Sequence, residues 1–222
     1  LSLTDPAAFI QSNVLGTLHI LQVAQEAGVK RFVHISSAEV YGPPQWLPID
    51  ETHPLFASTP YSASKIGSEK IVESFSHSLG LETVVLRLFN IYGPGQSQRT
   101  FIGNLVHQLV IDEAITLGRL TVSRDFTYVD DIMIALMAAA ISPSASGHTI
   151  NLGSGREYIL QEVLDLGLAL CDRKIVVSPP TNLQRPLTID NPRIVADVSL
   201  ASKLLAWKAS TSLRQGLSLT IQ

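Results

Sequence analysis

Helical stretches and short apolar runs alternate along this chain of 222 residues. Residues 6–27 and 61–79 carry the apolar spacing and stop signals of helices, whereas residues 31–36 and 83–88 are apolar runs of strand length. Since parallel strands need a helical crossover between them, this alternation predicts a parallel α/β core. The same criteria predict further helices at 101–111, 130–141, 159–170 and 198–206, and further strands at 114–117, 149–152 and 174–177.

The ends of the expected elements carry residues with known positional preferences. Asp5 and Pro6 stand where the N-cap and the first residue of a helix are expected, and Gly28 follows its last residue. Asp130 is a candidate N-cap of a later helix. Five prolines between residues 42 and 60 predict a long loop there.

Composition limits the kind of protein this can be. A net charge of −3 without a basic run argues against nucleic-acid binding. No apolar stretch reaches the ~18 residues of a membrane span and no signal peptide is visible, so we expect a cytoplasmic protein. Cys171 is the only cysteine, which excludes an internal disulfide framework. The six histidines form no HxH or HExxH pair, and Asp130 and Asp131 fit a helix cap and a packing contact better than metal ligands, so we predict no metal.

Tyr61 and Lys65 form the pattern that most directly suggests chemistry. Four residues apart, they lie on one face of the expected helix. The Lys65 ammonium is expected to lower the pKa of the Tyr61 phenol from about 10 toward neutrality. Such a phenol can take a proton from a sugar or alcohol hydroxyl while a hydride leaves the same carbon. Ser36 and Ser37, at the end of the preceding strand, could share the substrate, but a YxxxK pair alone also occurs on many solvated helix faces.

Six further blocks occur in order around this pair. They are residues 13–17 (NVLGT), 29–37 (VKRFV and SS), 86–95 (LRLFNIYGPG), 124–131 (RDFTYVDD), 151–155 (NLGSG) and 207–213 (W and TSL). Together they resemble the extended short-chain dehydrogenase/reductase family of nucleotide-sugar epimerases and dehydratases, over essentially the whole chain. The resemblance implies a Rossmann-like doubly wound parallel sheet with a smaller mixed α/β substrate-binding region. Residues 1–90 would form the C-terminal part of the dinucleotide-binding domain, and residues 91–222 most of the substrate-binding region, with an interleaved boundary.

One hallmark of that family is missing. The family opens with a strand, a GxxGxxG turn and a helix whose N-terminus holds the dinucleotide pyrophosphate. No GxxGxxG occurs here, and residues 153–155 (GSG) lie too late in the chain to be that turn. The first expected helix already resembles the family's fourth helix, so about three βα units of the family layout are not represented. We therefore expect a partial chain, and the choice between NAD and NADP depends on residues outside it.

The resemblance implies a role for each matching residue. Tyr61 would be the acid/base at sugar C4, and Ser37 would hydrogen-bond the reacting hydroxyl or ketone. The candidate cofactor contacts are Tyr61, Lys65 and Ser36, of which Lys65 would bind the nicotinamide ribose of NAD or NADP. A structural role is favoured for Ser36. Each of these residues could instead be an ordinary turn or surface residue.

A nucleotide-diphosphate sugar is the implied substrate. Its two negative charges require local arginines, preferably as bidentate donors. Arg124 matches the family's diphosphate-binding arginine, and Asn90 would hold the diphosphate through its amide. Arg185 resembles the arginine of an RPGD-like segment, but the Gly-Asp that should follow is replaced by Leu-Thr, so its role stays open.

The triplet Ser37-Ala38-Glu39 bears on the reaction class. Dehydratases of the family carry Thr-Asp-Glu there, and Ala38 lacks the carboxyl that would protonate the departing hydroxyl. Glu39 persists, as in some GDP-mannose dehydratases, decarboxylases and 4-ketoreductases, and a structural role for it is equally open. We expect an NAD(P)-dependent 4-epimerase acting through a 4-keto intermediate. The alternatives are a 4-ketoreductase, a 4,6-dehydratase or a decarboxylase, and an inactive member acting as a binding protein.

The resemblance also implies a homodimer. Members of the family commonly pair the YxxxK helix and the long helix before it with those of a second subunit. The apolar stripes on residues 6–27 and 61–79 are compatible with such an interface, and equally with core packing.

Overall fold

Three parallel strands form the main sheet of the computed structural model, which describes residues 2–171, 173, 175–177 and 191–222. Their order is β1 (Arg31–Ser37), β2 (Glu82–Leu88) and β7 (Thr149–Leu152). β1 and β2 pair along their whole length, and Ser37 at the end of β1 lies opposite Leu88. The carboxyl ends of these strands therefore meet at one edge of the sheet, where open α/β sheets bind ligands.

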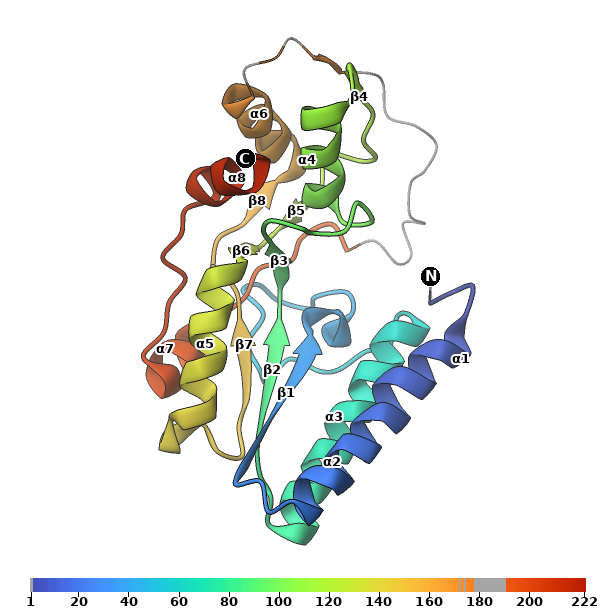
Figure 1. The fold of residues 1–222 in the computed structure, drawn as a ribbon, viewed down its shortest axis with the longest axis vertical. Coiled ribbons are helices and arrows are strands. Elements are labelled where there is room, and N and C mark those ends of the chain that lie inside the picture. The colour runs from blue at the N-terminus through green and yellow to red at the C-terminus, as the bar shows by residue number, and fades with distance from the viewer. Residues whose placement is uncertain (1, 172, 174, 178–190) are drawn as a thin grey trace.

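Helices cover both faces of this sheet (Figure 1). Side chains alternate along β2, so Val85 packs on one face while Val84 and Leu86 pack on the other. The first face is covered by α2 (Gly16–Glu26) and α3 (Pro60–Leu79), and the second by α5 (Val129–Ile141) and α7 (Ser199–Leu205). The predicted Rossmann-like α/β fold is confirmed.

The helix predicted over residues 6–27 forms, with a π-helical segment in its middle. Asp5 caps it as expected, because its carboxylate accepts a hydrogen bond from the Ala8 amide at 3.2 Å. Within the π-helical segment, Asn13 donates from Nδ2 to Ser64 Oγ of α3 at 2.9 Å, a contact that apolar spacing cannot predict. The three parts are α1 (Pro6–Phe9), η1 (Ile10–Leu15) and α2.

Local caps fix both ends of α3. Thr59 is its N-cap and forms a reciprocal capping box with Ser62, and Pro60 takes the first helical position. Gly80 ends the helix in the left-handed conformation with φ 70. Tyr61 thus lies in a well-capped first turn, next to the carboxyl edge of the sheet.

The start of α5 differs from the prediction. Its N-cap is Tyr128, and Asp130 is an exposed residue inside the first turn. The buried carboxylate is that of Asp131, which accepts hydrogen bonds from Ser210 Oγ at 2.8 Å and from the Thr211 amide at 2.9 Å. The cap predicted for Asp130 is wrong because the helix already begins at Val129, which places Asp130 inside the first turn.

A second lobe of short strands and helices stands above the sheet edge (Figure 1). Its core is formed by buried side chains such as Tyr92, Leu105, Phe126, Leu164 and Leu217. It contains the helices α4 (Phe101–Ile111), α6 (Leu160–Leu170) and α8 (Leu213–Ile221) and the strands β3 (Asn90–Tyr92), β4 (Ala114–Ile115), β5 (Ser123–Arg124), β6 (Phe126–Tyr128), β8 (Tyr158–Ile159) and β9 (Val176–Val177). None of the helices within the described ranges has the length and apolar character to cross a membrane.

Candidate active site

A cavity of about 530 Å³ opens between the sheet edge and the second lobe. Five residues singled out from the sequence line it, and they come from elements far apart in the chain. These are Ser37, Glu39, Tyr61, Asn90 and Arg124. The fold therefore brings the expected acid/base, its serine partner and the expected diphosphate contacts to one hollow.

Ser37 occupies the junction between a strand and a tight turn. It is the last residue of β1, and its Oγ accepts a hydrogen bond from the Glu39 amide at 3.2 Å, which caps the 3-10 turn η2 (Ala38–Tyr41). The same side chain lies near the Tyr61 phenol and acts to lower its pKa. Gly42 ends the turn with φ 63, and a Cβ there would lie 2.9 Å from the Phe56 carbonyl oxygen, so only glycine fits.

The electrostatics of Tyr61 differ from the expectation. Burial raises the pKa of its phenol, the Glu39 charge raises it further, and the hydrogen bond with Ser37 opposes the rise. Lys65 does not lower it in this structure, so that prediction is wrong. The physical reason is burial, which disfavours the charged phenolate, while Lys65 Nζ donates to the Ile35 carbonyl oxygen of β1 at 2.9 Å. Burial lowers the pKa of Lys65 itself, and the Glu69 carboxylate opposes this.

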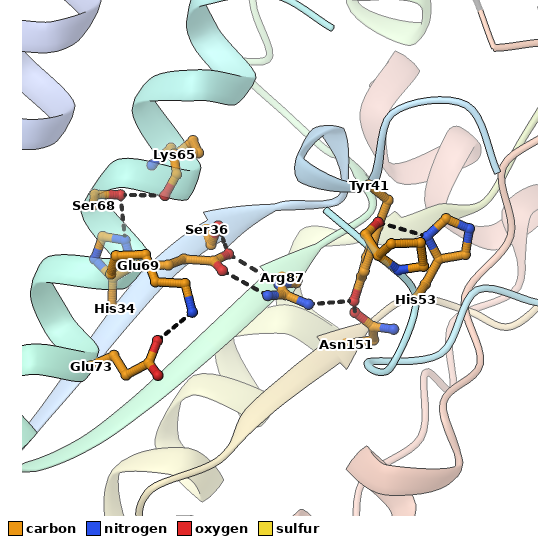
Figure 2. Close-up of polar contacts among 12 residues, drawn as sticks. His34, Ser36, Tyr41, His53, Lys65, Ser68, Glu69, Glu73, Arg87 and Asn151 are labelled. Atoms are coloured by element: carbon orange, nitrogen blue, oxygen red, sulfur yellow. Dashed lines mark hydrogen bonds and ion pairs between the residues drawn. The ribbon is translucent and has the colours of Figure 1, made fainter. Parts of the chain in front are cut away.

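Ser36 lies on the opposite side of the strand from Ser37 and is 3% exposed. Its hydroxyl donates a short hydrogen bond to Glu69 Oε1 beneath α3 (Figure 2). This burial and contact agree with the structural role that the sequence favours for Ser36 over cofactor contact, and that role stays a prediction.

The second lobe contributes polar groups to the cavity. Arg124 donates from one guanidinium nitrogen to the carbonyl oxygens of Ser123 at 2.7 Å and Asn191 at 2.8 Å. Asn90 donates from Nδ2 to the Asp125 carbonyl oxygen at 3.3 Å. The position of Arg185 lies outside the described residues.

Two further arginines, which the sequence analysis did not single out, also line the cavity. Arg99 comes directly before Thr100, the N-cap of α4, and Arg119 follows Gly118 in the loop before β5. Neither arginine belongs to a periodic sequence pattern. The one indication in the sequence analysis was that a diphosphate needs several cationic side chains around it. With Arg124, they give this cavity a donor set that suits a phosphorylated ligand.

The residues present fit one end of a dinucleotide cofactor. Ser37 and Tyr61 line the cavity at the carboxyl end of β1, and Lys65, which does not line it, lies on the same helix as Tyr61 with its ammonium at the Ile35 carbonyl oxygen; these are donors that a ribose and a reacting carbonyl would need. The glycine turn that would hold the pyrophosphate has no counterpart in the 222-residue sequence. Within the part of the chain that the structure describes, no cluster of three or more His, Cys, Asp or Glu could hold a metal ion.

The chain matches a known family model and is similar in sequence to curated proteins. The family model described as GDP-mannose 4,6 dehydratase matches residues 1–220. A UDP-glucuronate 4-epimerase from Thermodesulfobacterium geofontis is 31% identical, over 99% of this chain and 67% of its own length. A dTDP-glucose 4,6-dehydratase from Shigella flexneri is 30% identical, over 100% of this chain and 68% of its own. The chain thus spans about two thirds of the length of these curated relatives.

Solved structures agree on the fold. RMD from Pseudomonas aeruginosa, complexed with NADPH, superposes with a TM-score of 0.91 at 27% identity, over 99% of this chain and 75% of that one. The UDP-glucuronic acid 4-epimerase from Bacillus cereus, in complex with UDP-glucuronic acid and NAD, gives a TM-score of 0.86 at 25% identity, over 96% of this chain and 67% of that one.

Proposed function

The chain belongs to the extended short-chain dehydrogenase/reductase family that includes GDP-mannose 4,6 dehydratase, and from that premise we propose that its cavity binds a nucleotide-diphosphate sugar for oxidation and reduction at sugar C4. The proposed reaction is a 4-epimerisation through a 4-keto intermediate, with NAD or NADP as cofactor. One observation carries the proposal: Ser37 and Tyr61 line the same cavity as three arginines.

In the proposed reaction, Ser37 and Tyr61 would both hydrogen-bond the oxygen at C4. Tyr61 would take the hydroxyl proton as the 4-keto sugar forms and return it as the sugar is reduced on its other face. Since burial raises the pKa of Tyr61, the phenol is protonated at neutral pH, and a positive charge beside it is needed to make it a base. A bound nicotinamide would supply the hydride chemistry.

The diphosphate would lie against the second lobe. Arg124 is the central donor in this proposal because the backbone carbonyl oxygens of Ser123 and Asn191 hold its guanidinium in place. Arg99, Arg119 and the Asn90 amide line the same cavity and would complete the donor set. Charged donors of this kind contribute about 1.5–3 kcal/mol per hydrogen bond.

A second group of reactions is supported by Glu39. Its side chain is exposed at the cavity, and its charge acts on Tyr61, so a carboxylate stands near the reacting carbon in this proposal. Ala38 beside it offers no acid for a leaving hydroxyl. A 4-ketoreductase, a 4,6-dehydratase or a decarboxylase is therefore the alternative, and a family member that only binds its ligand is the further alternative.

We also propose a cytoplasmic homodimer paired through α2 and α3. Ile20 and Val23 on α2 are 58% and 60% exposed, and such side chains favour an interface. Sedimentation of the wild type and of Val23→Glu tests this, with a dimer and a monomer as the expected results.

Two measurements test the proposed function. Calorimetric titration with NAD⁺ and NADP⁺, with and without UDP-glucose, identifies the ligands of the protein. Incubation with UDP-glucose, UDP-glucuronate, GDP-mannose and dTDP-glucose in the presence of NAD⁺ or NADP⁺, and with a 4-keto-6-deoxy nucleotide sugar in the presence of NADH or NADPH, followed by proton NMR of the products, identifies the reaction. A C4 epimer supports the main proposal, and a 4-keto-6-deoxy sugar, a reduced 4-keto sugar or a decarboxylated product supports the second group. Ligand binding without any product leaves only the binding protein.

A further inference from the structure

A buried ion pair lies beneath the candidate active site. Arg87 on β2 donates to Glu69 on α3 from two nitrogens, Nε to Oε1 at 3.1 Å and a terminal nitrogen to Oε2 at 2.7 Å. The two residues are 6% and 4% exposed. Removing two charges from water is costly, and well-packed apolar side chains often replace such a pair without loss of stability. Stability alone therefore gives a weak account of why this pair is present.

Hydrogen bonds extend the pair across the face of the sheet under α3 (Figure 2). On one side, Ser36 Oγ on β1 donates to Glu69 Oε1. On the other side, Arg87 donates to Tyr41 Oη at 3.0 Å, and Tyr41 Oη donates to Asn151 Oδ1 on β7 at 2.6 Å. The chain of contacts thus joins all three strands of the sheet to α3 and to the turn η2.

Two members of this network, Ser36 and Tyr41, are close in sequence to groups of the candidate active site. Ser36 comes one residue before Ser37, and Tyr41 is the last residue of the turn η2, which also contains Glu39. Glu69 follows Lys65 by four residues and Tyr61 by eight, so these three side chains share one face of α3. A shift of α3 along β1 would move Tyr61 relative to Ser37 and would have to break the contacts of Glu69.

We propose that Glu69 and Arg87 are positioning residues that fix the Tyr61 phenol against the Ser37 hydroxyl. They do not line the cavity, so they act through the backbone of β1, β2 and α3. The contact of Lys65 with Ile35 joins the same two elements, but through a backbone acceptor that does not fix a side chain of β1. Catalysis is sensitive to such positioning, since a misplacement of about 1 Å can lower a rate about 100-fold.

The test separates positioning from stability. A single substitution would leave a buried charge unpaired, whereas the double variant Glu69→Leu/Arg87→Met replaces the pair by apolar side chains of similar size. The control is Lys70→Met/Glu73→Leu, which removes the exposed ion pair of the same helix. We expect the melting temperature of the first double variant to stay within about 5 °C of wild type.

Two readouts follow from each variant. The inference rests on the proposed function only where turnover is measured. The first readout does not depend on that function: it is the NMR signal of tyrosine labelled with 13C at Cζ. The chain has five tyrosines, and Tyr61→Phe identifies the signal of interest. The second readout is kcat and KM with the sugar nucleotide that the wild type turns over.

We expect the Tyr61 signal to move in the Glu69→Leu/Arg87→Met variant and to stay in the control, while those of Tyr92 and Tyr128 in the second lobe stay in both. kcat should fall about 100-fold with little change in KM. An unchanged Tyr61 signal in the folded variant overturns the inference. If the Tyr61 signal moves in the double variant but the wild-type protein turns over no sugar nucleotide, the positioning inference is supported and the proposed function is refuted. If the double variant does not fold, the Tyr61 signal is measured in Ser36→Ala instead. An unchanged Tyr61 signal in that variant would again overturn the inference.

Discussion

Lys65 donates from Nζ to the backbone carbonyl oxygen of Ile35 at 2.9 Å and so joins α3 to the end of β1. The strand residue that accepts this bond lies two positions before Ser37, and the helix residue that donates it lies four positions after Tyr61. The two hydroxyl groups of the candidate active site are therefore held by elements that a charged hydrogen bond connects. The contact gives the half-buried Lys65 ammonium a hydrogen-bond acceptor at this junction.

Replacing Tyr61 with phenylalanine should abolish turnover and spare ligand binding. The ring and its packing remain, so only the hydroxyl that faces Ser37 is lost. We expect kcat to fall by about 100- to 10,000-fold, the range of acid–base catalysis, with an unchanged calorimetric affinity for the sugar nucleotide. Tyr158→Phe, on β8 of the second lobe and outside the cavity lining, is the matched control. Near-normal turnover by Tyr61→Phe would remove the phenol from the proposed reaction.

Replacing Arg124 with alanine should weaken binding of the nucleotide more than it affects stability. The guanidinium lines the cavity, and its loss removes charged donors to a diphosphate worth about 1.5–3 kcal/mol, or roughly 10- to 100-fold in affinity. The measurement is titration with UDP. Arg156→Ala is the control, since Arg156 is exposed and does not line the cavity. Equal UDP affinity in both variants would contradict the diphosphate contact of Arg124.

Much of the fold could be predicted because the longer elements repeat an apolar pattern. Residues 101–111 were predicted as a helix with the bounds that α4 has. β3, β5, β6 and β8 escaped prediction because strands of two or three residues are too short to show alternation. α8 did carry a signal, with a serine cap at Ser212 and apolar residues at helical spacing after it, which was not recognised.

The site was only partly predictable, for a different reason. The spacing of Tyr61 and Lys65 indicates a shared helix face, but spacing cannot tell whether an ammonium meets a phenol or a backbone carbonyl oxygen. The direction of the pKa shift of Tyr61 is set mainly by burial of its phenol, which depends on tertiary packing and not on the spacing of two residues. Arg99 and Arg119 reach the cavity by loop geometry, which no periodic pattern encodes.

Replacing Asp131 with alanine should destabilise the protein, whereas replacing Asp130 should not. Both lie in the first turn of α5, so both variants lose the same favourable interaction with the helix dipole. Asp131 is buried and its loss leaves Ser210 Oγ and the Thr211 amide without their acceptor, at a cost of about 1–3 kcal/mol. Asp130 is exposed, and its variant should stay within about 0.5 kcal/mol of wild type. Urea unfolding of the two variants measures the difference, and equal free energies of unfolding would refute the anchoring role of Asp131.

His34 should make the protein less stable as the pH falls below neutrality. Burial under α3 lowers its pKa from 6.5 to about 4, the Lys65 charge acts in the same direction, and the Glu69 charge opposes both. Above pH 6.5 the imidazole is neutral in the folded and the unfolded chain. Between pH 6.5 and about 4 the unfolded chain binds a proton that the folded chain does not, so the free energy of unfolding decreases with falling pH.

The loss attributable to His34 should reach about 2–3 kcal/mol between about pH 7 and about pH 4.5. His34→Gln removes the titrating group and leaves a partner for Ser68 Oγ, which lies 3.0 Å from the imidazole. We expect this variant to be less stable than wild type near neutrality but to lose less stability on acidification. His19→Gln, at an exposed position of α2, is the control and should follow the wild-type pH dependence. Urea unfolding across this range decides the matter, because parallel curves for wild type and His34→Gln would mean that the buried imidazole does not couple protonation to folding.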